Sequence, residues 1–505
     1  MGNKADINEN DLLKYWAKDV NINVITMYLE SFVDGKEFII NSLDCRKPIL
    51  VLKSARSKAG QKAASSHTGA LANSDDVVSN IFEQFGIIRV DTVDDLFNSA
   101  IMMDNLPVLK GKRIAIVTNS GGPGVICVDK LEKEGLELAQ ISDETKERIR
   151  AIIHPEGSAN NPIDLLPNGD HIGFEKVTKL VLQDNNVDGV IVIFTEPIMV
   201  KPFEIVEAIN SIDSEKPIVQ VVFPLPEFWE KYKNESKYKK RLFKNVEDAV
   251  VVLKNSYKYY EGNNIKNEKL EDSNFIKKLE MYKKYSLTKT LNGKYLNFEK
   301  SYNLLKKYEL PVVPTEILSY DKLENLSIDF PVVLKAYGEN IIHKSDIGGV
   351  VLNIKSINEL KEKADYIKQQ GEKFKLRIDE FIVQKFVKIN QEILIGGYSD
   401  HSFGPMLMFG SGGKYVEVFN DVQLRSSLLS LNEIKDMVSS TKIGKILSGI
   451  RGEKSMNLNL IYEIIDKISF MLLNENNILE LDFNPITYVN ENELTILDWR
   501  IKAKI

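Results

Sequence analysis

The chain has 505 residues, of which 43% are hydrophobic and 27% are charged, and its formal net charge is −6. These values are typical of a globular protein of about three domains, and a weak negative charge argues against nucleic acid or an anionic membrane as the main partner. The two cysteines are too few for a disulfide framework, and no apolar run is long enough to span a bilayer. We therefore expect a cytoplasmic protein without nucleic-acid or membrane partners.

The first half of the chain alternates short β-branched runs with amphipathic helical patterns. This alternation is typical of parallel sheets with helices on both faces. A break after Leu106-Pro107 divides the region into two such domains, which we place at residues 1–108 and 109–255. The predicted strands are residues 24–29, 48–53, 113–118, 189–194 and 217–223, and predicted helices between them include residues 75–85 and 124–134.

The composition changes after residue 254, where Lys, Asn, Glu and Tyr dominate and aliphatic residues are few. Such a stretch predicts a linker over residues 256–295, with some helix and without a buried core. A further domain then covers residues 296–505 and opens with a helix at 299–308. Its predicted strands are residues 310–314, 332–335, 349–354, 381–386, 392–396, 406–409 and 414–419.

His67 lies among small residues, in Ala-Ala-Ser-Ser-His-Thr-Gly-Ala-Leu-Ala, just ahead of a predicted helix. Small neighbours let an anion approach the backbone, and the free N–H groups of a helix start would hold phosphate. A neutral imidazole nitrogen can attack phosphorus near pH 7. A loop histidine near a turn is the alternative, and with five histidines in the chain the residues alone do not decide.

Residues 48–97 resemble the phosphohistidine segment of the ADP-forming acyl-CoA synthetases, in the succinyl-CoA synthetase superfamily. The resemblance is carried by Lys-Ser-Ala-Arg-Ser at 53–57, by the motif around His67, and by Gly-Ile-Ile-Arg-Val-Asp-Thr at 86–92. It implies two flavodoxin-like parallel-sheet domains, with His67 as the phosphate carrier and with Thr68 and Gly69 binding the phosphate.

Two further loops take roles through the same resemblance. Glu30 ends a predicted strand, and the family places there an acidic residue that hydrogen-bonds the active histidine and fixes its tautomer. The turn with Gly121 and Gly122 would supply a second helix N-terminus that faces the phosphohistidine. By themselves these features are a solvated strand end and a weak glycine-rich turn signal. The loop at residues 160–165 also resembles the family, and a structural turn explains it equally well.

Residues 296–505 resemble the ATP-grasp subunit of the same family. Lys335 ends an apolar strand, where a cation can reach nucleotide phosphates, although an edge-strand lysine is the alternative. The resemblance implies that His343 takes the phosphoryl group from His67 and passes it to ADP. It also implies a nucleotide site. Gln384, Phe386 and Val387 belong to the hinge that receives the adenine, Glu392 follows in a strand, and Arg425 lies near the nucleotide phosphates.

The same resemblance implies a Mg²⁺ site near the end of the chain. Asn484 and Asp498 match the two metal-ligand positions, and Mg²⁺ prefers such hard oxygen ligands. Asp482 shares a strand face with Asn484 and matches an acidic residue that hydrogen-bonds the visiting phosphohistidine. Without the resemblance, scattered acidic residues in strands are mostly surface residues.

The reaction that this resemblance implies is acyl-CoA + ADP + phosphate ⇌ carboxylate + ATP + CoA, by a phosphohistidine relay. We expect a short-chain acid such as acetate, and an oligomer. Full-length relatives carry an amino-terminal CoA-binding domain, and Met1 stands at a usually internal position. We therefore expect an incomplete first domain and a CoA-binding part that is supplied either in the same chain or by a separate CoA-binding chain as a partner. The alternatives are a succinyl-CoA synthetase-like ligase and a non-catalytic regulatory remnant.

Overall fold

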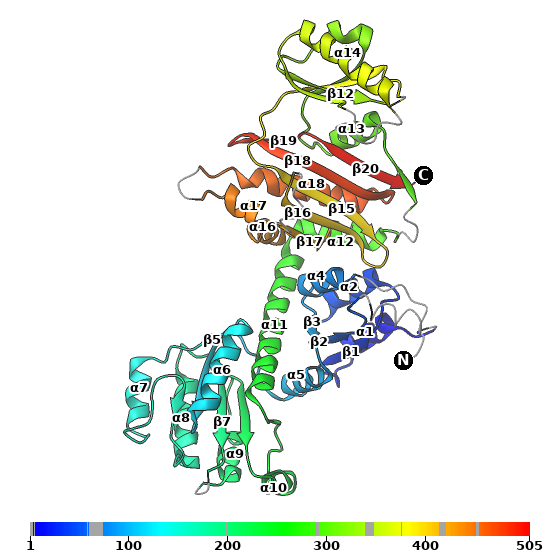
Figure 1. Ribbon diagram of the computed structural model, residues 1–505. Helices are drawn as coiled ribbons and strands as arrows, with labels where there is room; N and C mark the ends of the chain where they lie inside the picture. The colour runs from blue at the N-terminus through cyan, green and yellow to red at the C-terminus, as the bar shows by residue number, and fades with distance from the viewer. Residues whose placement is uncertain are drawn as a thin grey trace. The chain divides into compact units, whose positions relative to one another are not determined.

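The computed structural model describes residues 4, 6–57, 59, 74–197, 200–287, 292–338, 348–374, 376–413, 421–450 and 454–504 (Figure 1). The chain forms two compact units, Met1–Leu270 and Glu271–Ile505. Within the described ranges, no helix combines the length and the apolar character that crossing a membrane requires.

The first unit begins with a parallel sheet in the order β1-β2-β3. Strand β2 is buried along its whole length because helices cover both faces of the sheet. The predicted strands 24–29 and 48–53 and the predicted helix 75–85 are confirmed. The elements are α1 (Glu9–Lys18), β1 (Ile25–Leu29), α2 (Gly35–Asp44), β2 (Ile49–Lys53), α4 (Asp75–Gln84), β3 (Ile88–Val90) and α5 (Val93–Asn105).

A second parallel sheet follows in the order β5-β4-β7-β8-β9, and β6 also pairs with β4. The predicted strands 113–118, 189–194 and 217–223 are confirmed, and the helix predicted at 124–134 begins three residues earlier. The elements are β4 (Arg113–Thr118), α6 (Gly121–Lys133), β5 (Glu137–Leu138), α7 (Asp143–Arg150), β6 (Ile163–Asp164), α8 (His171–Gln183), β7 (Gly189–Thr195), α9 (Pro202–Asn210), β8 (Ile218–Phe223), α10 (Glu227–Glu235), β9 (Leu242–Phe243) and α11 (Val246–Glu271).

The loop at residues 160–165 has a structural role in this second sheet. The Asn161 side chain accepts a hydrogen bond from the Ile116 N–H at 2.9 Å. It donates to the carbonyls of Ile114 at 3.0 Å and Ala139 at 2.9 Å. One amide side chain thereby satisfies backbone groups at the edge of β4, which supports the structural interpretation of this loop.

Helix α11 contradicts the prediction that residues 256–295 bury no core. Two lysines of this helix are buried. The Lys266 ammonium donates to the Cys45 carbonyl, and the Lys269 ammonium donates to the Gln84 carbonyl. The backbone at Gly262 approaches Gly86 so closely that an added Cβ would lie 2.8 Å from the Gly86 Cα. The linker prediction fails here because lysine stems can pack as apolar surface when the charged head finds acceptors.

The second unit contains two antiparallel sheets. The large sheet has the order β10-β20-β18-β15-β16-β17, with β19 beside β18, and the small sheet has the order β11-β14-β12-β13. The elements are α12 (Ser273–Lys284), β10 (Gly293–Tyr295), α13 (Phe298–Lys307), β11 (Thr315–Ser319), η1 (Tyr320–Asn325), β12 (Val332–Tyr337), β13 (Val350–Ile354), α14 (Ile357–Lys373), β14 (Glu380–Lys385), β15 (Ile393–Asp400), β16 (Gly404–Ser411), β17 (Val422–Ser426), α16 (Leu431–Ser439), α17 (Lys442–Leu447), α18 (Leu458–Asn474), β18 (Ile478–Asn490), β19 (Glu493–Ile496) and β20 (Trp499–Lys504).

The core of the second unit lies between the large sheet and its helices. Leu481 and Phe483 of β18 belong to this core, so Asp482 and Asn484 point to the opposite face. Helix α12 also packs here, with a buried Tyr282 whose hydroxyl donates to the Phe403 carbonyl at 2.7 Å. This burial lies within the region that was predicted to be a linker.

Most of the strands predicted for the second unit are confirmed, namely those at 332–335, 349–354, 381–386, 392–396 and 406–409. The strand predicted at 310–314 is absent from the described residues, where Val312 makes an isolated bridge to Ile496. Pro311 and Pro314 lack the N–H groups that a ladder needs. The strand predicted at 414–419 lies outside the described residues.

Candidate functional site

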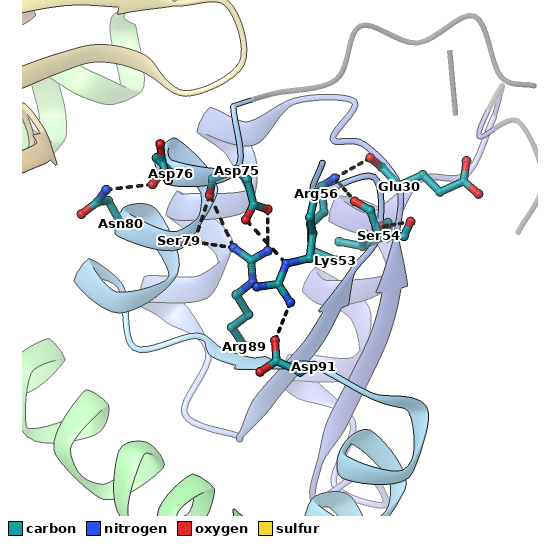
Figure 2. Close-up of polar contacts among 11 residues, drawn as sticks. Glu30, Lys53, Ser54, Arg56, Asp75, Asp76, Ser79, Asn80, Arg89 and Asp91 are labelled. Atoms are coloured by element: carbon teal, nitrogen blue, oxygen red, sulfur yellow. Dashed lines mark hydrogen bonds and ion pairs between the residues drawn. The ribbon is translucent and has the colours of Figure 1, made fainter. Parts of the chain in front are cut away.

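Glu30 directly follows β1, and its backbone is tied to the end of β2. The Lys53 ammonium, on a residue that is 2% exposed, donates to the carbonyls of Glu30 and Ser54, both at 2.7 Å. Burial lowers the pKa of Lys53 to about 8. The Glu30 side chain extends away from this lysine, so its carboxylate remains available to another partner (Figure 2). His67, Thr68 and Gly69 lie outside the described residues, and the Glu30–His67 contact stays a prediction.

Gly121 and Gly122 form the exposed first turn of α6. The N-cap residue, Ser120, makes no side-chain capping bond, and a Cβ added at either glycine would meet nothing within 4 Å. The first N–H groups of the helix are therefore accessible, as an anion site requires. Asn119 fixes the turn by exchanging two hydrogen bonds of 2.9 Å with the Thr195 backbone. This turn and Glu30 belong to different sheets, and their convergence on one phosphate stays a prediction.

In the second unit, Lys335 of β12 reaches from the small sheet to the large one. Its Nζ lies 3.3 Å from the Leu497 carbonyl oxygen and 3.8 Å from Asp498 Oδ1. Gln384 of β14 lies on the same face of the small sheet, because it is paired with Val333, two residues before Lys335. The Gln384 amide donates to Thr315 Oγ1 at 3.1 Å.

The predicted adenine-binding hinge follows β14 directly. The Phe386 N–H donates to the Pro331 carbonyl at 3.0 Å. Phe386 therefore has its carbonyl to offer a nucleotide, whereas its N–H is already used. Both Phe386 and Val387 are half-buried, as side chains at the edge of a ligand site can be.

Asn484 and Asp498 lie next to each other, as the predicted metal site requires. The Asn484 N–H donates to the Asp498 carbonyl at 3.2 Å, and Asn484 Oδ1 accepts the Gly413 N–H at 2.8 Å. The Glu392 side chain lies directly against Gly413, so that a Cβ added at Gly413 would lie 1.8 Å from Glu392 Oε2. We call Lys335, Glu392, Gly413, Asn484 and Asp498 the phosphate-side cluster.

The phosphate-side cluster fits a Mg²⁺ ion that is shared with a nucleotide. Asn484 and Asp498 offer hard oxygen donors, and Mg²⁺ usually takes one or two protein oxygens and fills the rest of its shell with water and phosphate. The described residues contain no group of three or more His, Cys, Asp or Glu side chains that could hold a metal by themselves.

Asp482 lies two residues before Asn484 and lines a pocket of about 550 Å³. Arg500 is its cross-strand neighbour on β20 and lines the same pocket, together with His401 and Glu480. Loss of hydration against the pocket walls raises the pKa of the Asp482 carboxyl, Arg500 acts in the opposite direction, and Asp498 raises it further. A carboxylate and a guanidinium are thus presented side by side, next to the predicted metal ligands.

The structure does not bring Arg425 to the phosphate-side cluster. Arg425 pairs with Leu407, which belongs to the core beneath the helices, so it points to the opposite face from Asn484. It is 7% exposed, and its Nη2 lies 3.7 Å from Asp436 Oδ2 of α16. The prediction that Arg425 lies near the nucleotide phosphates is therefore not supported, because the strand alternates faces at this position. His343 lies outside the described residues.

Sequence reasoning missed two features of these sites. One is Gly413, whose φ of +84° and close contact with Glu392 exclude any side chain; the Gly-Gly pair at 412–413 was its signal. The other is a network of Arg56, Asp75, Arg89 and Asp91, which sequence spacing alone does not reveal.

Three family models match the chain in succession. The succinyl-CoA ligase like flavodoxin domain matches residues 1–103, the Ligase-CoA domain matches residues 114–263, and the ATP-grasp domain matches residues 289–503. The ADP-forming acetate–CoA ligase I of Archaeoglobus fulgidus is 33% identical over 521 residues, which cover 99% of this chain and 73% of the relative. The chain belongs to the family of ADP-forming acyl-CoA ligases.

Other members of this ligase family show the same likeness. The alpha subunit of acetate–CoA ligase (ADP-forming) I of Pyrococcus furiosus is 36% identical over 44% of this chain and 49% of the subunit, and the beta subunit is 33% identical over 38% and 85%. A solved acetyl-coenzyme A synthetase of Candidatus Korarchaeum cryptofilum, in complex with phosphate and ADP, aligns with a TM-score of 0.50 and 29% identity over 53% of this chain and 60% of that one. The predicted fold class, parallel flavodoxin-like domains followed by an ATP-grasp domain, is confirmed.

Proposed function

We propose that this ligase interconverts acyl-CoA, ADP and phosphate with a carboxylate, ATP and CoA, and that the acid is short, such as acetate. The observation that carries the proposal is the phosphate-side cluster within an ATP-grasp domain that follows two CoA-ligase domains. The similarity to an acetate–CoA ligase supports the choice of acid. We place the domains at residues 1–108, 109–255 and 296–505. The helices of residues 256–284 belong to the two units and do not form a separate linker.

The proposed reaction begins with acyl-group chemistry. Phosphate attacks the acyl-CoA carbonyl carbon, the C–S bond breaks, and CoA leaves as the thiol while acyl phosphate forms. A ring nitrogen of His67 then attacks phosphorus, the P–O bond to the acyl group breaks, and the carboxylate leaves. Glu30 accepts a hydrogen bond from the other ring nitrogen and stabilises the charged ring, while N–H groups at Thr68, Gly69 and the Gly121 turn hold the phosphoryl oxygens.

The second half of the proposed reaction moves the phosphoryl group to the nucleotide. The P–N bond at His67 breaks as a bond to His343 forms, and a terminal phosphate oxygen of ADP then displaces His343. Lys335 balances negative charge on the nucleotide phosphates, while Gln384, Phe386 and Val387 orient the adenine. Asn484 and Asp498 would hold Mg²⁺, which supplies charge neutralisation to the phosphates. Asp482 receives the imidazole that carries the phosphoryl group into the pocket.

We further propose that a CoA-binding chain acts together with this one. The relatives with separate alpha and beta subunits support a multi-chain arrangement. Addition of a CoA-binding chain should then raise the rate of acyl-CoA formation above the rate of this chain alone. A rate that does not change on this addition would contradict this part of the proposal.

An end-product assay tests the proposed reaction. The chain and a CoA-binding partner are incubated with Mg-ATP, CoA and one acid at a time: acetate, propionate, 4-hydroxybutyrate, succinate or a cinnamate. We expect ADP and phosphate to form in step with acyl-CoA, fastest with a short monocarboxylate. Formation of AMP and pyrophosphate would refute the ADP-forming assignment, and a preference for succinate would favour the succinyl-CoA synthetase-like alternative.

A further inference from the structure

A compact network of charged side chains lies at one end of the β1–β3 sheet (Figure 2). Arg56 Nη1 lies 2.5 Å from Asp91 Oδ1, and Arg56 Nε lies 3.5 Å from Asp75 Oδ2. Arg89 Nη2 lies 2.5 Å from Asp75 Oδ1, and a second Arg89 nitrogen donates to Ser79 Oγ. We call Arg56, Asp75, Arg89 and Asp91 the anchor network.

The anchor network joins two points that are far apart along the chain. Arg56 follows the end of β2 by three residues, and Asp75 is the first residue of α4. The eighteen residues between them, 57–74, contain His67. The contact between Arg56 and Asp75 therefore fixes both ends of the His67-bearing stretch at one place on the sheet.

Strand β3 provides the fixed point to which both ends are held. Arg89 is the central residue of β3, and its side chain is 13% exposed, so it is held firmly in the fold. Asp91 follows the same strand directly and holds Arg56 from the other side. Each end of the stretch thus bonds to a residue in or beside β3.

The same end of β2 is tied to Glu30. Lys53 donates to the carbonyls of Glu30 and Ser54, and the Ser54 N–H donates to the Leu29 carbonyl at 3.0 Å. Buried hydrogen bonds of this kind hold the ends of β1 and β2 in register. The start of the His67-bearing stretch and Glu30, which carries the proposed orienting carboxylate, are therefore both held by hydrogen bonds at the same edge of the sheet.

We propose that Arg56 is a positioning residue, which acts with Asp75 and Asp91 to fix the ends of the His67-bearing stretch relative to Glu30. This inference rests on the proposed function, in which His67 is the phosphate carrier. The ion pairs of Arg56 are half-exposed, since the Arg56 side chain is 48% exposed and that of Asp91 is 71% exposed. Exposed ion pairs contribute little to stability, whereas misplacement of a reacting group by about 1 Å can slow a reaction on the order of 100-fold.

The test compares Arg56→Gln with the conservative Arg56→Lys and with Arg46→Gln. Arg46 is a matched control, because it is an exposed arginine of the same domain that bonds the Asn267 side chain at 2.6 Å. Each full-length variant is incubated with γ-labelled Mg-ATP. The rate of acid-labile, base-stable labelling of the peptide that contains His67 is measured at saturating nucleotide, together with the nucleotide KM and the Tm.

We expect Arg56→Gln to slow labelling at least about tenfold, with an unchanged nucleotide KM and a Tm close to that of the wild type. Arg56→Lys should recover much of the rate, and Arg46→Gln should match the wild type. Asp91→Asn removes an exposed partner of Arg56 and should reproduce the slowing, which provides a second variant if Arg56→Gln fails to fold.

Two results would overturn the inference. One is labelling by Arg56→Gln or Asp91→Asn at the rate of the Arg46→Gln control; the other is a slowing that follows the loss of Tm and is not recovered by Arg56→Lys. Failure of the proposed function looks different, because the His67 peptide of the wild type would then carry no label.

Discussion

Replacement of Lys266 by methionine should stabilise the first unit at neutral pH. Lys266 of α11 is 2% exposed, and burial lowers its pKa to about 8 from 10.5. At 1.36 kcal/mol per pKa unit, keeping this buried side chain charged costs about 3 kcal/mol. The Lys266→Met change also removes the 3.4 Å hydrogen bond to the Cys45 carbonyl, worth about 1 kcal/mol. Methionine fills similar space, so we expect a net stabilisation of about 2 kcal/mol at pH 7.

The pH dependence of this effect has a definite sign. The pKa of Lys266 is lower in the folded chain than in the unfolded chain, so the unfolded chain binds the proton more tightly between about pH 8 and pH 10.5. The penalty is complete below pH 8, shrinks as the pH rises through this window, and is absent above it. The advantage of Lys266→Met should therefore fade as the pH approaches 10.5.

Urea unfolding of the full chain at pH 7 and at high pH measures this effect. Lys133→Met is the exposed control on α6 and should change little at either pH. Lys269→Met is the contrasting buried variant, and it should destabilise, because Lys269 bonds the Gln84 carbonyl and lies 4.5 Å from the centre of the Phe85 ring. A Lys266→Met variant that is less stable than the wild type at pH 7, or whose advantage does not change with pH, would refute the reasoning.

Three further changes test other parts of the structure. Asp498→Asn should raise the Kd for Mg-ATP about tenfold while the Tm stays within a few degrees, and an unchanged magnesium dependence by titration calorimetry would contradict the metal assignment. Gly413→Ala should weaken nucleotide binding and lower the unfolding free energy of the chain by more than Gly135→Ala does. Both glycines have positive φ, but an added Cβ at Gly413 meets Glu392 at 1.8 Å, whereas an added Cβ at Gly135 meets nothing within 4 Å. Equal unfolding free energies of the two variants would argue against this contact. Burial by itself raises the pKa of Glu134, but hydrogen bonds and ion pairs with Lys130 and Lys254 lower it to about 2 from 4.5. Glu134→Gln should therefore lower the free energy of unfolding by about 2 kcal/mol above pH 4.5. That difference should disappear as the pH falls through 2, and a difference that persists there in acid unfolding would rule out the ion pairs as its cause.

The parallel strands and their helices could be predicted from the sequence because burial on both faces leaves an unbroken β-branched run. Strands β2 and β4 carry such runs, and the structure places them in the middle of helix-covered sheets. The linker prediction failed for a physical reason as well. Lys266, Lys269 and Lys278 all bury their stems and find acceptors at a distance, which no local pattern of charge can show.

The candidate site could be predicted only in part. The family resemblance singled out Lys335, Asn484 and Asp498 as candidates, and the structure brings these three residues together. Arg425 was misplaced because its neighbours in sequence match the family while the register of β17 directs it to the helix-covered face. The anchor network stayed hidden because its four members come from separate elements and meet only in the fold.

The phosphoryl state of His67 tests the central claim most directly. The full chain is incubated with γ-labelled Mg-ATP, digested, and mapped for acid-labile, base-stable phosphate. The account predicts label on the peptide that contains His67 and none on the matching peptide of His67→Ala, where label stays on His343. In His343→Ala the His67 peptide should not be labelled from ATP. Label on the residue-67 peptide of His67→Ala, or a wild-type chain that binds Mg-ATP while its His67 peptide never becomes labelled, would contradict the account.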